Sequence, residues 1–247
     1  MRCFVLLIFF VCFSVSAFAH EAGLTVDLAQ DSVDITTGFD GARITLFGVK
    51  DDAGHVAVVI RGPKKDVLVR KKNSVFGIWM NSASVRYEDV PQFYDFALSD
   101  KEENLLDAET RKLYGIGLGA LKFKPDDDAL KPSEVEPFSK ALVRNKQVEG
   151  LFPVEAQDII FMNDVFFKTE FYIPANVPVG DYVVETFLID GGNVLDKSET
   201  QVRVAQVGFS SNVYQIAHVH SLLYGLGIVF IAVLAGWLSN AVRQKNK

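Results

Sequence analysis

A long uncharged segment near the C-terminus constrains the fold of this chain more than any other feature. Residues 204–242 contain no Asp, Glu, Lys or Arg, and the run Leu222–Leu238 is apolar, broken only by glycines, Tyr224 and Trp237. Such a run approaches the roughly 20 residues, at about 1.5 Å each, that a helix needs to cross the hydrocarbon core of a membrane. The sequence therefore predicts one transmembrane helix within residues 211–242. The alternative is a buried helix at the end of a soluble domain.

The residues after this segment predict its orientation. Arg243, Lys245 and Lys247 follow the apolar run directly. Because loops rich in Lys and Arg stay in the cytoplasm, residues 243–247 are predicted to form a cytoplasmic basic tail. The part of the chain before the helix is then predicted to lie on the opposite side of the membrane.

The N-terminus is typical of a secretory signal peptide. Residues 1–19 combine the single charge of Arg2, a short apolar stretch and the small-residue site Ala17–Ala19. This pattern predicts cleavage before His20, and a retained membrane anchor is the rival interpretation. Together the two ends predict a single-pass protein of a bacterial inner membrane, with residues 20–210 in the periplasm and the lipid bilayer as a partner.

Composition excludes several classes of function. The 25 basic and 31 acidic side chains give a net charge of −6, which argues against a nucleic-acid partner. Both cysteines, Cys3 and Cys12, lie in the predicted signal peptide. Disulfides, cysteine-ligated metals and cysteine nucleophiles are therefore excluded from the mature chain.

Strand patterns dominate the exported part, which predicts a mainly β fold, an immunoglobulin-like β-sandwich. Val56–Ile60 is continuously apolar, as in a central strand buried on both faces, and residues 165–173 alternate apolar and polar side chains. Gly191–Asn193 predicts the turn of a late hairpin. Tyr182 and Val184 follow the pattern of a tyrosine corner, with Val184 where antibody domains place a cysteine.

A helical segment is predicted to be inserted into this sandwich at about residues 99–150. Ser99 and Glu102 form a capping-box pattern, and Ser133 opens a second amphipathic stretch. We expect the apolar faces of these helices to lie on the sandwich. Two separate domains are the alternative organisation.

Several sequence blocks together resemble a family of alphaproteobacterial transmembrane proteins that have no assigned activity. Members are often encoded beside sulfite-exporter-like permeases of the TauE/SafE type, which implies an accessory role in envelope anion or sulfur-compound transport. The resemblance carries over no functional residue. The blocks cover nearly the whole mature chain and are Ile35–Phe39, Ile44–Gly48, Val58–Pro63, Val69–Lys72, Gly77–Asn81, Val90–Tyr94, Pro174–Gly180, Leu222–Gly225 and Ala235–Leu238.

A basic segment is the candidate ligand site. Six cations lie within residues 61–72, and a hairpin at Gly62-Pro63 would let them converge on an oxyanion or an acidic partner. A solvated hairpin end is the competing interpretation. Trp79 and Asn81 would supply an apolar and a polar wall, although general burial tendency favours a core position for Trp79. The candidate binding residues are Arg61, Lys64, Arg70, Lys71, Trp79 and Asn81.

Two weaker candidates remain. The amine and imidazole of His20 would form a copper site if His55 lay beside them, although cleavage at that position and a turn at His55 explain both residues equally well. In the C-terminal apolar run, small residues four apart create a surface that another helix can approach closely. These helix-packing residues are Ala232, Ala235, Gly236 and Ser239.

No catalytic constellation is present in the sequence. Gly115–Gly119 lacks the features of a phosphate loop and Asp126–Asp128 lacks those of a calcium loop, and we expect neither an enzyme nor a resident cofactor. An enzyme built on scattered carboxylates such as Asp158 and Glu170 ranks last. The leading hypothesis is a non-enzymatic accessory or assembly partner of a membrane transporter. The alternative is a periplasmic module that binds an oxyanion or copper.

Overall fold

The computed structural model describes residues 23–51, 53–127, 129–208 and 217–245, and the fold is mainly β, as predicted. The predicted signal peptide, His20 and the last two residues of the basic tail lie outside the described residues.

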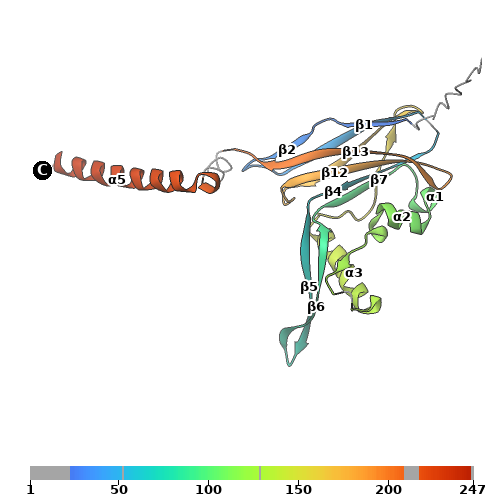
Figure 1. The fold of residues 1–247 in the computed structure, drawn as a ribbon, viewed down its shortest axis with the longest axis horizontal. Coiled ribbons are helices and arrows are strands. Elements are labelled where there is room, and N and C mark those ends of the chain that lie inside the picture. The colour runs from blue at the N-terminus through green and yellow to red at the C-terminus, as the bar shows by residue number, and fades with distance from the viewer. Residues whose placement is uncertain (1–22, 52, 128, 209–216, 246–247) are drawn as a thin grey trace, which may run out of the picture.

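Two sheets form the body of the protein (Figure 1). One has the strand order β1-β3-β11-β10 and the other has the order β2-β13-β12-β4-β7-β9. The orders β1-β3-β11-β10 and β13-β12-β4 correspond to the ABED and GFC sheets of an immunoglobulin-type sandwich. The strands are β1 (Leu24–Leu28), β2 (Ser32–Ile35), β3 (Gly41–Lys50), β4 (His55–Arg61), β7 (Tyr94–Leu98), β9 (Gln157–Asp158), β10 (Ile160–Phe161), β11 (Phe166–Pro174), β12 (Gly180–Asp190) and β13 (Asn193–Gln206).

The main core fills the space between these sheets and extends over the outer face of β4. Val56–Ile60 is fully buried, because β4 lies in the middle of its sheet and side chains on both of its faces are covered. Along β11 the predicted alternation is confirmed, since Phe167, Phe171 and Ile173 point into the core while Tyr172 is exposed. The period of two in the sequence thus identified which face of this strand is buried.

The predicted tyrosine corner is also confirmed. The Tyr182 hydroxyl donates a hydrogen bond of 2.6 Å to the carbonyl oxygen of Pro178, four residues upstream. The Tyr182 ring is fully buried against Phe93, with 5.7 Å between ring centroids, and Val184 lies in the core. This contact fixes the entry of the chain into β12.

Two insertions separate β4 from β9. The first is a long hairpin of β5 (Lys64–Val75) and β6 (Ile78–Pro91), which joins β8 (Lys124–Pro125) in a third sheet and projects away from the sandwich (Figure 1). The second is the predicted helical segment. It comprises α1 (Glu102–Leu105), α2 (Ala108–Tyr114), the short 3₁₀ helix η1 (Leu118–Ala120) and α3 (Pro132–Val148).

The expectation that both parts of the helical segment lie on the sandwich is only half correct. Leu105, Leu106 and Ile116 join the main core, so the α1–α2 part covers the sandwich as expected. By contrast, α3 packs against the hairpin and makes a second, smaller core with it (Figure 1). Its apolar stripe fits the hairpin because β5 and β6 present their own apolar face there. The buried members of this core are Val69, Val85, Tyr87, Val90 and Leu142.

The predicted capping box at Ser99 is wrong. The backbone N–H of Val56 donates to Ser99 Oγ at 2.9 Å, so this hydroxyl ties β4 to the end of β7 instead of capping a helix. The cap in this region is Asp107, whose side chain accepts from the N–H of Thr110 at 2.7 Å at the start of α2.

The prediction of a transmembrane helix is corrected by the structure. A helix, α5 (Ser221–Lys245), does form where one was expected. In the described parts of the chain, however, no helix is both long enough and apolar enough to cross a membrane. Residues 211–216, the start of the predicted membrane segment, lie outside the described residues, as do residues 209 and 210 before them.

Candidate oxyanion-binding groove

The predicted hairpin at Gly62-Pro63 does not exist. Strand β4 belongs to the six-stranded sheet and β5 to the three-stranded sheet, so Gly62-Pro63 carries the chain from one sheet to the other. The hairpin turns instead at Phe76-Gly77, where Val75 pairs with Ile78. The six predicted cations therefore do not converge as one group.

Arg61 is a structural residue. It forms an ion pair with Glu185 on β12, and its guanidinium donates to the carbonyl oxygens of Tyr114, at 2.5 Å, and Gly115, at 3.1 Å. Burial lowers the pKa of Arg61, because desolvation disfavours the charged form. Lys64 is exposed at the start of β5 and does not line the groove described below.

Arg70, Lys71 and Lys72 lie together along a groove of about 710 Å³ between the hairpin and α3. From α3 the groove receives Arg144 and, in the first helical turn, Ser133; β6 contributes Ser84. Its apolar floor is continuous with the smaller core. The lining residues of this floor are Val69, Val85, Phe138 and Ala141.

The chemistry of this groove suits an oxyanion. The cationic residues Arg70, Lys71, Lys72 and Arg144 all line the groove. Of the β5 cations, Lys71 shares the strand face of the buried Val69, whereas Arg70 and Lys72 have the opposite face. Arginine can bind an oxyanion through two parallel N–H donors. Hydroxyl groups and the positive end of the α3 dipole lie on the same lining. The one carboxylate, that of Glu134, already accepts from the N–H of Lys131 at 3.0 Å.

Sequence reasoning named Arg70 and Lys71 as candidate binding residues, counted Lys72 among the six cations of the segment, and missed Arg144. The residue lies three positions after Ala141, so the two are neighbours on the surface of α3. That spacing was visible in the sequence. What was not visible is that α3 covers the hairpin, which brings Arg144 to the β5 cations.

Trp79 and Asn81 do not form walls of the groove. Trp79 is 71% exposed, which also contradicts the expectation that it lies in the core. Asn81 is exposed as well, and both residues lie nearer the turn of the hairpin than the groove does.

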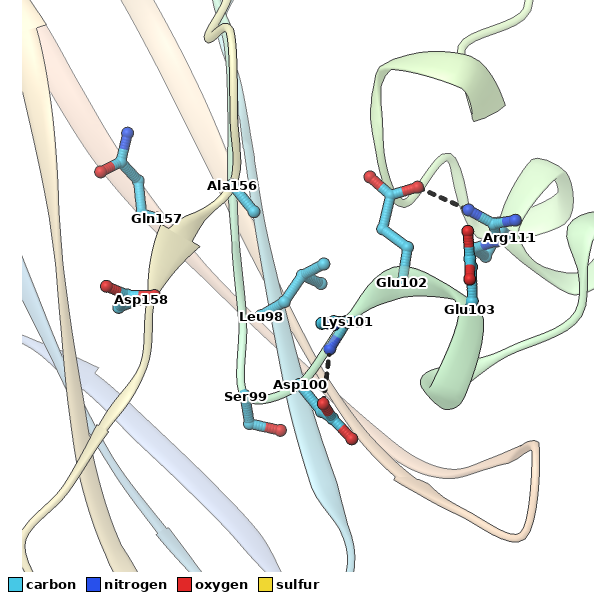
Figure 2. Close-up of a pocket in the computed structure, with 10 residues that line it drawn as sticks. All are labelled: Leu98, Ser99, Asp100, Lys101, Glu102, Glu103, Arg111, Ala156, Gln157 and Asp158. Carbon is cyan, nitrogen blue, oxygen red and sulfur yellow. Dashed lines mark hydrogen bonds and ion pairs between the residues drawn. The ribbon is translucent and has the colours of Figure 1, made fainter.

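A second cleft lies at the end of β7 (Figure 2). Two of its acidic residues are engaged in structural contacts. Asp100 accepts from the N–H of Lys101 at 2.7 Å, which lowers the pKa of Asp100, and Glu102 pairs with Arg111 at 2.5 Å. Asp158 lines this cleft, whereas Glu170 lies on β11 in an ion pair with Lys168 at 3.6 Å. These contacts give Asp100 and Glu102 a structural role.

The copper hypothesis stays a prediction. His55 begins β4, and its Nδ1 lies 3.4 Å from Ser99 Oγ. Among the described residues no group of three or more His, Cys, Asp or Glu side chains could hold a metal ion. His20, the other proposed ligand, is outside the described residues.

The small-residue face of α5 also stays a prediction. Ala232, Ala235 and Gly236 lie on α5, and a Cβ added at Gly236 would meet no atom within 4 Å. The side chain of Ser239 lies outside the described part of the structure.

Comparison with known proteins assigns the family. A family profile described as "Putative transmembrane protein (Alph_Pro_TM)" matches residues 23–245. The chain belongs to this family. The predicted resemblance to alphaproteobacterial transmembrane proteins is thereby confirmed. That members of the Alph_Pro_TM family are encoded beside sulfite-exporter-like permeases stays a prediction.

Other comparisons add little to the Alph_Pro_TM assignment. Among curated proteins, no sequence matches the chain. Among solved structures, one match comes from work titled "Structural basis of T cell specificity and activation by the bacterial superantigen toxic shock syndrome toxin-1". It has 9% sequence identity, covers 75% of this chain and 100% of the other, and has a TM-score of 0.27. A score this low supports no argument about this Alph_Pro_TM protein.

Proposed function

We propose that this protein is a non-enzymatic accessory component of a membrane transport system, and that the groove between the hairpin and α3 is its oxyanion-binding site. The observation behind the proposal is the meeting of Arg70, Lys71 and Lys72 from β5 with Arg144 from α3 along one groove. The family assignment places the protein with membrane proteins. A periplasmic position for the groove follows from the predicted signal peptide.

The groove is suited to binding rather than to catalysis. Its polar lining consists of cations, hydroxyls and one carboxylate that already accepts a backbone N–H, so the groove offers mainly hydrogen-bond donors, which suits an anion. Sulfite presents its acceptor oxygens in a pyramid, and sulfate and phosphate present theirs in a tetrahedron. All three are therefore suitable ligands to test. The resemblance to proteins encoded beside sulfite exporters makes sulfite the first anion to test.

Titration of the full-length protein in detergent with sulfite, sulfate and phosphate tests the binding site. We expect at least one of these anions to raise the melting temperature and to bind with a measurable heat. Losing one charge-assisted hydrogen bond costs about 1.5–3 kcal/mol, so Arg144→Gln should weaken binding roughly 10- to 100-fold. Arg43→Gln is the matched control, because Arg43 is exposed on β3 outside the groove. Equal affinities of the wild type and Arg144→Gln would disprove the site.

Affinity purification from native membranes tests the accessory role separately. We expect a polytopic membrane protein to be recovered in stoichiometric amount with the full-length chain. Recovery of the chain alone would contradict the accessory role and would leave the anion titration unaffected.

A further inference from the structure

Large apolar side chains are exposed at the end of the β5–β6 hairpin, far from the sandwich (Figure 1). We call residues 76–80 the hairpin tip. Phe76 is 101% exposed, Ile78 66%, Trp79 71% and Met80 56%. Contiguous exposed apolar surface of this kind marks a protein or membrane interaction site.

The backbone conformation of the hairpin tip is unfavourable for a phenylalanine at position 76. Phe76 and Gly77 form a two-residue turn with φ values of 52° and 80°, both in the left-handed region. Turns of this type favour Asn, Asp or Gly, and a bulky residue at positive φ is strained. Because the Phe76 ring is fully exposed, packing within the chain does not offset this strain. Strain retained without a packing benefit points to a function.

The arrangement of side chains favours immersion over docking on a flat surface. Successive residues of a strand point to opposite faces, so Ile78 and Met80 share one face of β6 and Trp79 points to the other. The hairpin tip is therefore apolar on both faces. A partner that covered one face would leave the other in water, whereas a lipid phase covers both.

Cations precede the hairpin tip on β5, at the distance expected for lipid headgroups. Lys72 lies four residues before Phe76, a distance of about 13 Å at 3.3 Å per residue. Interfacial segments bury their apolar groups by about 5–10 Å, which would leave Lys71 and Lys72 at the level of the phosphates. Residues 67–87 contain no acidic side chain, although the chain as a whole has a net charge of −6.

We propose that the hairpin tip inserts into the interface of an anionic lipid bilayer, with Lys71 and Lys72 contacting headgroup phosphates. The inference rests on the tip itself and does not require the groove to bind a free anion. A headgroup phosphate and a dissolved oxyanion offer these lysines the same chemistry, so the test must separate the two sources.

Fluorescence of Trp79 reports on insertion directly. The chain has two tryptophans, so Trp237→Phe leaves Trp79 as the single fluorophore. After reconstitution of this full-length variant into phosphatidylglycerol vesicles, we expect Trp79 emission at shorter wavelength and quenching by brominated acyl chains. Emission typical of water would overturn the proposal. A shift to shorter wavelength without quenching would also overturn it, because it would indicate a protein contact.

Variants in the same background identify the groups responsible. Phe76→Asn places a favoured residue in the turn, so the hairpin should fold while quenching of Trp79 decreases. Lys71→Gln and Lys72→Gln should each reduce the inserted fraction about fivefold in anionic vesicles, the equivalent of about 1 kcal/mol per charge. Leu113→Ser, at an exposed apolar position on α2, should change nothing. Unchanged quenching in Phe76→Asn would refute insertion by the tip, whatever the result of the sulfite titration.

Discussion

Arg61 and Glu185 form an ion pair between adjacent strands of the six-stranded sheet, β4 and β12. The same guanidinium binds the carbonyl oxygens of Tyr114 and Gly115, at the end of α2. One side chain thus joins the sandwich to the inserted helical segment. Lys197 also contacts Glu185, at 2.5 Å, which completes a small charge network.

Removal of this cation should destabilise the fold. Arg61→Gln leaves Glu185 with Lys197 alone and removes the donor to the Tyr114 carbonyl oxygen, whereas the Gly115 carbonyl oxygen keeps the Tyr94 hydroxyl as a donor. We therefore expect a loss of about 2–3 kcal/mol in the free energy of unfolding. Thermal denaturation of the full-length protein measures the loss. Arg203→Gln, which breaks the exposed pair with Asp181, is the control and should cost less than about 1 kcal/mol. Equal effects of the two variants would contradict the structural role of Arg61.

The tyrosine corner gives a second stability prediction. Tyr182→Phe removes the hydrogen bond to Pro178 and leaves that partly buried carbonyl oxygen without its donor, which should cost about 1–2 kcal/mol. Tyr172→Phe removes a bond of 3.0 Å from an exposed ring to the Asp40 carbonyl oxygen and should cost less. Chemical denaturation of both variants provides the comparison. A Tyr182→Phe protein as stable as the wild type would show that the bond is dispensable.

Asp95 should make stability depend on pH. Burial raises the pKa of Asp95 to about 7, well above the value of an exposed carboxyl. Between about pH 4 and pH 7 the native state therefore holds a proton that the unfolded state has lost. The contribution of Asp95 to the free energy of unfolding is therefore fully present below about pH 4 and is lost as the pH rises through 7.

Asp95→Asn tests this dependence. The substitution removes the cost of ionising a buried carboxyl, so the variant should gain stability relative to the wild type as the pH rises, by up to about 4 kcal/mol at pH 8. Urea denaturation at pH 5 and pH 8 measures the difference. Asp34→Asn, at an exposed position on β2, should show no comparable gain. A constant difference between Asp95→Asn and wild type across this range would refute the assignment.

The position of α3, and with it the shape of the groove, should depend on the smaller core. Leu142 is buried between α3 and the hairpin, so Leu142→Ala should cost about 2–4 kcal/mol locally and loosen α3. Faster amide hydrogen exchange along α3, together with weaker anion binding, is the expected result. Val148→Ala, at an exposed position of the same helix, is the control. Unchanged exchange in Leu142→Ala would show that α3 does not depend on this contact.

Some of the candidate site was visible in the sequence and some was not. The cations Arg70, Lys71 and Lys72 stood out because they are consecutive. The error was the position of the turn: Gly62-Pro63 has the composition of a hairpin turn, but it links two sheets. Local composition predicts that the chain turns, whereas the pairing of the following strand decides which strand it meets.

Burial of single large side chains was also decided by context. Trp79 was expected in the core from its residue type, yet it lies at the exposed end of a hairpin that leaves the body of the protein. Propensity describes an average environment and contains no information about how far a strand extends beyond its neighbours.

The sequence by itself determined the mainly β architecture, the buried faces of β4 and β11, and the tyrosine corner, because each depends on spacing along one strand or on contacts a few residues apart. Only the tertiary structure decided that α3 covers the hairpin, that Arg144 lines the same groove as the β5 cations and that Arg61 forms an ion pair with Glu185. These relations join residues distant in the sequence, and they are fixed by which apolar surfaces bury one another.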